Sequence, residues 1–398
     1  MVENKSKRCA LILGGYVNGY NIIRALYDNG VHEIFLFDTE KRLGKFSNKI
    51  ISYREIEKSS SSLLRAILDL RKDYNLIVIF PTDDLQVKLL REIYYKIVNF
   101  CFIPFNPENV LFFMDKNEQY KECRRLRIPY PQTIIINKKD EINKIMEIKL
   151  PVLIKPATRL DLEAEVFRSL KISNIKEYRH NQSKLVHFLE KGISMIASEI
   201  IPGDDSNIYA YVGYRDFKGY IISEWIGGKL SQFPDDFGVF SSASNEAPEI
   251  IREQGRTLLN GMNLFGINQP EFKYDARDGL YKLMEINLRS MMWHRMGLVS
   301  GINLPIVQYF NAVGKVVPSQ SQEQKKIIHF IYFKHEIGNF LNRKKYFKKF
   351  FHNLFKGNEI HFAVFDFRDP LPFLYDLIKT IDMCLKIIIN KFIKNIKR

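Results

Sequence analysis

Cysteine is scarce in this 398-residue chain, and its placement argues against two kinds of site. The four cysteines lie far apart, with no CxxC spacing and no histidine at ligand distance: Cys9, Cys101, Cys123 and Cys384. A structural zinc site and a disulfide framework are therefore not expected. The pattern favours a reducing compartment, and we expect a cytoplasmic protein.

Long apolar runs are also missing. Residues 1–8 are basic, as at the start of a secretion signal, but the apolar run 9–13 that follows ends at Gly14 and is too short for one. The chain also lacks a run of about eighteen uncharged apolar residues, the length that a membrane span needs. We expect neither a secretion signal nor a spanning helix.

The charge is uneven along the chain. Hydrophobic residues make up 46% and aromatic residues 13%, enough to build the cores of two or three globular domains. Of the formal net charge of +15, residues 319–398 carry +9, with 16 Lys and Arg against 7 Asp and Glu. A basic appendage of this kind favours docking on an anionic surface.

The first part of the chain has the pattern of a parallel sheet covered by helices. Strands are predicted at 8–13, 33–37 and 76–80, alternating with helices at 21–27 and 63–70. The glycines after the first strand, Gly14, Gly15 and Gly19, do not match GxGxxG, so they indicate a tight turn and not a nicotinamide site. We take residues 1–112 as an N-terminal α/β domain.

A second unit of mixed periodicity follows, over residues 113–318. It opens with a helix at 116–125, and the prolines at 129 and 131 interrupt the pattern. A helix near 184–189 and strands at 152–155, 194–201, 208–212 and 220–225 predict an α+β domain. The Asp278-Gly279 turn predicts a hairpin between strands 272–274 and 281–286.

This hairpin carries a candidate metal site. Glu271 lies on one strand, whereas Glu285 and Asn287 lie two residues apart on the next and so share a face. Oxygen ligands without His or Cys suit Mg²⁺, and Mn²⁺ could replace it. Taken alone, the same pattern also fits the solvated side of a half-buried strand.

The order of other polar residues supports the metal site. Lys116 and Lys155 come before the hairpin, the second at the end of an apolar strand, and Arg289 comes just after it. Together with segment 198–205, this ordered set resembles the ATP-grasp superfamily of carboxylate-amine ligases, over residues 8–308. The resemblance implies an α/β and α+β fold, with an N-terminal parallel-sheet pre-ATP-grasp domain, a two-part ATP-grasp domain and a basic C-terminal extension.

The resemblance also implies roles for individual residues. Lys116 and Lys155 would contact the phosphates and adenine of ATP, and Asp205 would bind the ribose hydroxyls. The backbone that pairs with the adenine edge would be supplied by Glu199, Ile200 and Ile201. Magnesium would be held by Glu271, Glu285 and Asn287, and Arg289 would face the phosphate and acyl groups.

Within the superfamily the chain resembles the D-aspartate ligase type. The similar segments are Gly14-Gly15 with Arg24, residues 81–84 and residues 228–238, in which Lys229 would reach the transferred phosphate. One departure is the absence of glycine between Lys155 and Gly192, where many members have a glycine-rich flap. The phosphates could instead be covered by Arg159, Arg168 or Lys171.

Ligation chemistry suits these residue types. A carboxylate is a poor electrophile until ATP converts it into an acyl phosphate, which an amine then attacks; the phosphoryl transfer needs cations at fixed positions. Thr82, Asp83 and Asp84 follow a parallel strand, where open α/β sheets bind ligands, and are candidates for holding the amine substrate. Asp83 could equally cap a helix starting near Leu85.

Two further substrate candidates follow the metal strand. His294 and Arg295 could bind a substrate carboxylate, although a histidine there could also be a packing or hydrogen-bonding residue. The expected partners are a small-molecule carboxylate and an amine, and a homodimer is compatible with the sequence.

The C-terminal region, residues 319–398, ends in an amphipathic helix over about 373–396. Its apolar residues share one face, and lysines such as Lys379 and Lys386 occupy the opposite side. Such a helix could lie on an anionic membrane surface or pack its apolar face on the protein's own core. Residues 343–355 mix basic and aromatic side chains, but no nucleic-acid-binding motif accompanies them, so nucleic acid is not the expected partner.

The sequence therefore predicts an ADP-forming carboxylate-amine ligase that makes an amide on an amino acid or a cell-envelope precursor. It would act in the cytoplasm, with possible contact at the inner membrane face. Two alternatives stay open. One is an ATP-binding scaffold without catalysis, which the glycine-free flap favours. The other is an ATP-grasp carboxylase that uses bicarbonate.

Overall fold

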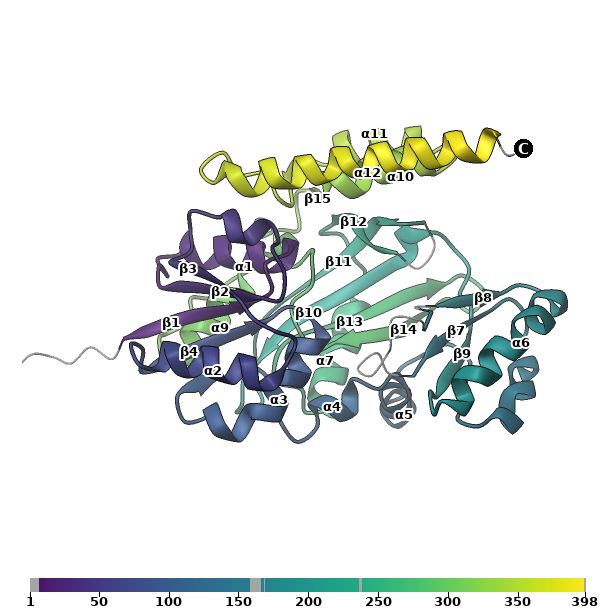
Figure 1. Cartoon of the computed structure of the whole chain (residues 1–398), viewed down its shortest axis with the longest axis horizontal. Helices are drawn as coiled ribbons and strands as arrows, with labels where there is room; N and C mark the ends of the chain where they lie inside the picture. The colour runs from purple at the N-terminus through teal and green to yellow at the C-terminus, as the bar shows by residue number, and fades with distance from the viewer. Residues whose placement is uncertain (1–6, 158–165, 168, 236–237, 397–398) are drawn as a thin grey trace, which may run out of the picture.

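Three β-sheets with helices on their faces make up the chain (Figure 1). The computed structural model describes residues 7–157, 166–167, 169–235 and 238–396. The first sheet belongs to the N-terminal part, the second forms a small lobe, and the third runs through the middle of the molecule and continues into the C-terminal region.

The N-terminal sheet is parallel throughout, as predicted, with strand order β3-β2-β1-β4-β5. β1 and β4 lie in the middle and are almost fully buried, which explains their continuous apolar sequences. The strands are β1 (Arg8–Leu13), β2 (Ile34–Asp38), β3 (Ser52–Glu55), β4 (Leu76–Pro81) and β5 (Cys101–Phe102). The helices are α1 (Val17–Tyr27), α2 (Ser60–Arg71) and α3 (Asp84–Ile97), with a short 3₁₀ turn, η1 (Leu43–Phe46).

The glycine turn after β1 is tight, as expected. Gly14 has φ +86°, and a Cβ there would lie 2.3 Å from the Thr82 hydroxyl oxygen. The Gly15 amide donates a 2.6 Å hydrogen bond to the Asp38 carboxylate at the end of β2. This turn therefore holds the ends of β1, β2 and β4 together.

The small lobe is an antiparallel sheet of order β6-β9-β7-β8 with a separate apolar core. Its strands are β6 (Thr133–Ile136), β7 (Val152–Pro156), β8 (Leu170–Ile172) and β9 (Met195–Glu199). One face is covered by α6 (Ile175–Glu190) and η2 (Lys139–Glu147) (Figure 1). The lobe matches the α+β character predicted for this stretch.

The third sheet has seven strands in the order β14-β13-β10-β11-β12-β15-β16. They are β10 (Ile208–Arg215), β11 (Ile221–Phe233), β12 (Val239–Ser244), β13 (Gly266–Asp275), β14 (Leu280–Asn287), β15 (Ile328–Ile331) and β16 (Glu359–Phe362). β13 and β14 form the predicted hairpin around Asp278-Gly279. β15 and β16 come from the C-terminal region, so this region extends the sheet instead of standing apart.

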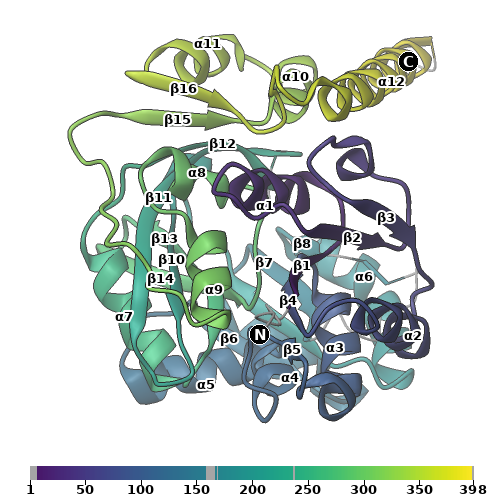
Figure 2. The same ribbon diagram turned by 90° about the vertical axis from the view of Figure 1, so that its left-hand side faces the viewer.

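Helices join the three sheets. They are α4 (Val110–Phe113), α5 (Lys116–Leu126), α7 (Ile250–Gly261), α8 (Arg295–Val299) and α9 (Leu304–Ala312), with the 3₁₀ turn η3 (Asp205–Asn207). α9 packs on the N-terminal sheet, where Ile306 and Tyr309 share a core with Ile12 and Val78. The sheet formed by β10–β14 is thereby fixed against the N-terminal sheet (Figure 2).

The C-terminal region adds α10 (Phe333–Asn342), α11 (Phe347–Phe355) and α12 (Pro370–Ile396) along one edge of the molecule. The predicted terminal helix is confirmed, but the interpretation that its apolar face packs on the core is wrong. Asp376 and Thr380 point inward and are buried, whereas Ile378 and Ile381 are exposed. The side chains of Phe392, Lys394, Ile396 and Lys397 lie outside the described part. None of the helices, over the residues described, combines the length and apolar character needed to span a bilayer.

Candidate active site

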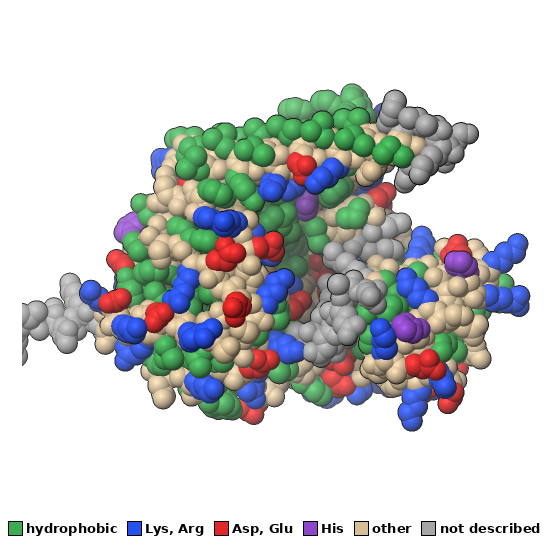
Figure 3. Space-filling model, in the orientation of Figure 1, with side chains coloured by type: hydrophobic (Ala, Val, Ile, Leu, Met, Phe, Trp, Pro, Cys, Tyr) green, Lys and Arg blue, Asp and Glu red, His purple; other side chains and the backbone are tan. Residues whose placement is uncertain are grey.

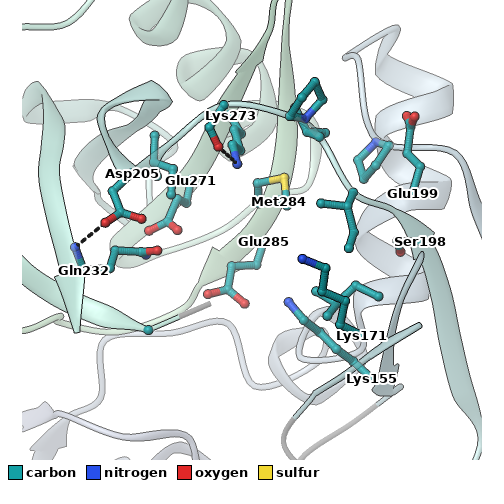
Figure 4. A pocket seen from close by; sticks show the side chains of 18 of the residues that line it. Lys155, Lys171, Ser198, Glu199, Asp205, Gln232, Glu271, Lys273, Met284 and Glu285 are labelled. Atoms are coloured by element: carbon teal, nitrogen blue, oxygen red, sulfur yellow. Dashed lines mark hydrogen bonds between the residues drawn. The ribbon is translucent and has the colours of Figure 1, made fainter. Parts of the chain in front are cut away.

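A cavity of about 510 Å³ lies between the small lobe and the seven-stranded sheet (Figure 4). β7, β8 and β9 supply one wall, and β10, β11, β13 and β14 supply the other. The start of α5 and the loop 200–205 close its ends. Of the predicted ATP-binding residues, all six line it: Lys116, Lys155, Glu199, Ile200, Ile201 and Asp205.

Two of the three predicted metal ligands face this cavity. Glu271 on β13 and Glu285 on β14 are direct partners across the antiparallel pair, and Figure 4 shows both carboxylates directed toward the space between the walls. Asn287 is the partner of Gln269 in the same ladder and lies in an adjoining hollow of about 50 Å³. Because Lys116 and Glu285 line both spaces, all three side chains gather at one end of the hairpin.

Lysines neutralise the two carboxylates. Glu285 forms an ion pair with Lys116, and the Glu271 carboxylate lies 2.8 Å from the Lys229 ammonium. Lys229 and Glu271 are both largely buried, so their charges are well shielded from water. Buried charges persist only when they are compensated, which indicates a site built to hold cations and anions together.

The donor set fits Mg²⁺. It consists of the carboxylate oxygens of Glu271 and Glu285 and the amide oxygen of Asn287, the ligand type that Mg²⁺ prefers. Across the described residues no cluster of three His, Cys, Asp or Glu side chains forms a metal site. The protein would therefore offer two carboxylates and one amide, and the phosphates of a nucleotide would supply the remaining oxygens.

Two further lysines reach the cavity from the small lobe. Lys155 on β7 and Lys171 on β8 extend toward Glu285 (Figure 4). Lys171 was one of three candidates for covering the phosphates, and the structure brings it to the cavity. The other two, Arg159 and Arg168, lie outside the described residues.

The predicted adenine segment forms the opposite end of the cavity. The Glu199 side chain points away from the cavity (Figure 4), where Arg277 binds it at 2.7 Å and the Gln132 amide at 3.0 Å. The backbone of residues 199–201 is left beside apolar walls that include Leu153, Ile196 and Met284. An apolar slot bordered by backbone groups suits a planar base.

Asp205, the predicted ribose ligand, lies at the start of η3. Its carboxylate accepts a 3.1 Å hydrogen bond from the Gln232 amide and pairs with Arg343 at 2.7 Å. Arg343 also binds Asp235 at 2.7 Å. Arg343 belongs to the C-terminal region, between α10 and α11, so this region contributes a cation to the cavity.

Sequence reasoning missed several lining residues. Lys273 lies two residues after Glu271 on β13 and therefore shares its face, a spacing that could have revealed it. Gln232 belongs to a segment that was singled out for Lys229 alone. Nothing in the sequence marks Arg343 as part of a site, because it stands in a run of basic residues of the kind that is common on protein surfaces.

Arg289 comes just after β14, and its partner Asp84 is the first residue of α3 in the N-terminal part of the chain. The Arg289 guanidinium binds the Asp84 carboxylate through two hydrogen bonds of 2.7 and 3.1 Å. Asp84 lines the same small hollow as Asn287 and Glu285. The predicted arginine is thus held beside the candidate metal ligands by a residue from the α3 end of the N-terminal sheet.

Thr82 and Asp83 have local structural roles. The Thr82 hydroxyl donates a 2.6 Å hydrogen bond to the Leu13 carbonyl, which ties β4 to the glycine turn. Asp83 caps α3 by accepting a 2.8 Å hydrogen bond from the Gln86 amide, with Gln86 bonding back. The capping interpretation of Asp83 is therefore confirmed, and a substrate role for either residue stays a prediction.

The structure places His294 and Arg295 in different surroundings. The His294 ring is buried and hydrogen-bonds to the Gln269 side chain at 2.7 Å, and it accepts from the Met291 amide at 3.2 Å. Burial, together with the charge of the nearby Arg24, lowers the pKa of Arg295 to about 9. Neither residue lines the cavity, so their substrate role stays a prediction without geometric support.

The pH dependence of stability tests the burial of His294. Burial, with the nearby Arg289 guanidinium, lowers the pKa of His294 to about 3 from the ordinary 6.5. Between these values the unfolded chain binds a proton that the native state does not, so the free energy of unfolding falls as the pH drops below 6.5. We expect a contribution of up to about 1.4 kcal/mol per pH unit, measured by urea denaturation at pH 7 and pH 5.

The substitution His294→Gln should flatten this dependence, because glutamine does not titrate. His180→Gln is the matched control, since His180 is exposed on α6. An unchanged pH slope in His294→Gln would show that the ring does not carry the effect.

Comparison with known proteins supports the resemblance seen in the sequence. No family model matches the chain. A segment of 200 residues is 30% identical to the D-aspartate ligase of Enterococcus faecium (strain Aus0004). This match covers 48% of the chain and 48% of that relative, so it spans about half the length of the relative.

Solved structures match over a larger share of the chain. The ADP complex of purK, an N5-carboxyaminoimidazole ribonucleotide synthetase, has a TM-score of 0.63 at 12% identity, covering 85% of each chain. Biotin carboxylase from Campylobacter jejuni has a TM-score of 0.62 at 15% identity, covering 80% of this chain and 74% of that one. Both are ATP-grasp structures. The chain therefore has the ATP-grasp fold.

Proposed function

We propose that this protein is an ADP-forming ligase that uses ATP to join a carboxylate to an amine. The main support is the arrangement of charges at one end of the cavity, where Glu271 and Glu285 face lysines from α5, from β11 and from the small lobe. The other end of the same cavity suits adenine. Fold similarity to ATP-grasp enzymes and the D-aspartate ligase segment support the same assignment.

Each group has a role in the transfer of the terminal phosphoryl group. Lys116 and Lys155 would hold the phosphates, and Lys229 and Arg289 would stabilise negative charge on the moving group. Glu271, Glu285 and Asn287 would hold Mg²⁺, which supplies positive charge at the phosphate oxygens. The acyl phosphate formed on the carboxylate would then react with the amine, and inorganic phosphate would leave.

The amine and acid are proposed from the sequence similarity. D-aspartate is the first acid to test, because the similar half of the chain matches a D-aspartate ligase. The amine would belong to an amino acid or a cell-envelope precursor, and the enzyme would work in the cytoplasm. A homodimer is compatible with this function but is not needed for it.

ADP and phosphate release tests the proposal directly. Purified protein with Mg-ATP is supplied with a panel of D- and L-amino acids and amine-bearing envelope precursors. We expect release that requires one acid and one amine together. Tight ATP binding without turnover for any pair would indicate a scaffold, and release that depends on bicarbonate would indicate a carboxylase.

A further inference from the structure

The C-terminal region exposes a large apolar surface, which we call the tail surface. It is formed by α11, α12 and the segment 362–367. Figure 3 shows hydrophobic side chains as a continuous band along the edge of the molecule over α12. Its exposed members are Phe347, Phe351, Phe355, Phe362, Phe365, Phe367, Leu371, Leu374, Leu377, Ile378, Ile381, Leu385, Ile388, Ile389 and Ile393.

An ordinary amphipathic helix packs its apolar side on the body, but α12 turns most of its apolar side to the outside. Asp376 is 7% exposed and accepts a 2.8 Å hydrogen bond from the Tyr332 hydroxyl, while Thr380 is 6% exposed. Ile378 and Leu385, on the outer side, are 65% and 54% exposed. This polar edge holds the helix in place together with Phe373 and Tyr375, which pack against the core of the body near the start of α12. The remaining apolar side is left for a partner outside this chain.

α11 also exposes aromatic rings, although Phe350 on its inner side is buried. Phe347, Phe351 and Phe355 follow one another at four-residue spacing and so lie on one face of the helix. Their rings contact one another, with centroids 4.6 and 5.8 Å apart, yet the side chains are 42–69% exposed. Figures 1 and 2 both place α11 on the same edge of the molecule as α12.

Basic residues border the apolar groups. Lys344, Lys345 and Lys348 are exposed around the start of α11, and Lys379 and Lys386 are exposed on α12. The region from residue 319 onward carries a net charge of +9. Apolar side chains beside lysines match the chemistry of an acidic bilayer, where lysines meet phosphate headgroups and the apolar groups enter the acyl boundary.

We propose that the tail surface docks this protein on an anionic lipid bilayer, with α12 lying in the plane of the interface. A second copy fits less well, because a two-fold contact would place two regions of +9 against each other. Membrane docking goes beyond the proposed ligation, because the candidate groups for ligation lie in the cavity and none of them needs a membrane. The two are linked through Arg343, which follows α10 in this region and binds Asp205 in the cavity.

Vesicle flotation tests the docking. The full-length protein is mixed with vesicles of phosphatidylglycerol and phosphatidylcholine, or of phosphatidylcholine alone, without substrates. We expect at least about tenfold more binding to the anionic vesicles, and a decrease with added salt. Because no turnover is measured, the outcome does not depend on whether the ligase proposal is correct.

Two variants separate the apolar and the charged contributions. The triple substitution Ile381→Ser, Leu385→Ser and Ile388→Ser should lower vesicle binding at least about tenfold, because it removes apolar area from the outer side of α12. Lys344→Glu, Lys345→Glu and Lys348→Glu should remove the preference for anionic lipid. The matched control is Ile51→Ser, Leu68→Ser and Leu111→Ser, three exposed apolar residues elsewhere, which should bind as the wild type does.

Circular dichroism and ATP binding of each variant confirm that the chain is folded. The proposal is overturned if the wild-type protein does not float with anionic vesicles, or if the serine triple binds them equally well. It is also overturned if light scattering shows a wild-type dimer that the serine triple abolishes and vesicles are not bound, since the tail surface would then serve a second copy.

Discussion

The substitution Glu285→Gln is expected to lower the rate of ADP formation by roughly 10²–10³-fold. Glutamine keeps the size of the side chain but removes the charge that faces Glu271 across the hairpin and pairs with Lys116. If Glu285 holds a cation on the phosphates, its loss also raises the Mg²⁺ concentration needed for half-maximal rate. A coupled ADP assay over a Mg²⁺ titration measures both effects.

Glu122→Gln provides the control for this variant. Glu122 is a partly exposed glutamate on α5, the helix that carries Lys116, and it pairs with Arg125 outside the cavity. Its substitution should leave the rate within about twofold of the wild type, as for surface ion pairs in general. Wild-type activity in Glu285→Gln would remove the main support for the proposed metal site.

The sequence predicted the parts of the fold that depend on local pattern. β1 and β4 are continuous apolar runs because both faces of the parallel sheet are covered, and the Asp278-Gly279 turn marks the hairpin. The six residues predicted to bind ATP all line one cavity in the structure. Element ends were less accurate: α1 starts at Val17, before the predicted helix, and β11 runs to Phe233.

Long-range pairing was beyond the reach of sequence reasoning. β15 and β16 have four residues each and pair only because β12 offers an edge, so no local pattern marks them as part of the central sheet. The contribution of Arg343 to the cavity depends on that pairing. Amphipathic spacing likewise identified α12. It could not predict which side of the helix faces the body, because that depends on which residues of the body lie next to the helix.

Polar residues near the strand ends show a second limit. Asp83 and Thr82 lie where parallel sheets bind ligands, yet they are occupied with capping α3 and joining β4 to β1. His294 is buried against Gln269, although its position after the metal strand fits a ligand. Short-range hydrogen bonds and substrate contacts use the same residue types, so only geometry separates them.

Lys229→Met is expected to lower turnover by about 10²–10³-fold and also to destabilise the fold. The Lys229 side chain is 6% exposed, and its ammonium lies 2.8 Å from the Glu271 carboxylate. Removing one member of a buried ion pair costs about 3–5 kcal/mol, because the remaining charge is left without compensation. Urea denaturation gives the stability change, and ADP release measured well below the unfolding midpoint gives the activity.

A second substitution separates the two effects. In Lys229→Met with Glu271→Gln no buried charge is left alone, so stability should largely return while turnover stays low, since both the phosphate contact and a metal ligand are gone. Lys49→Met is the control: Lys49 is 5% exposed and lies outside the residues that line the cavity. It pairs with the half-exposed Asp28 at 2.7 Å and with the largely buried Asp366 at 3.6 Å. It should lose stability and keep its rate per folded molecule. If Lys229→Met behaved in the same way, the buried pair would be structural and the phosphate role of Lys229 would be excluded.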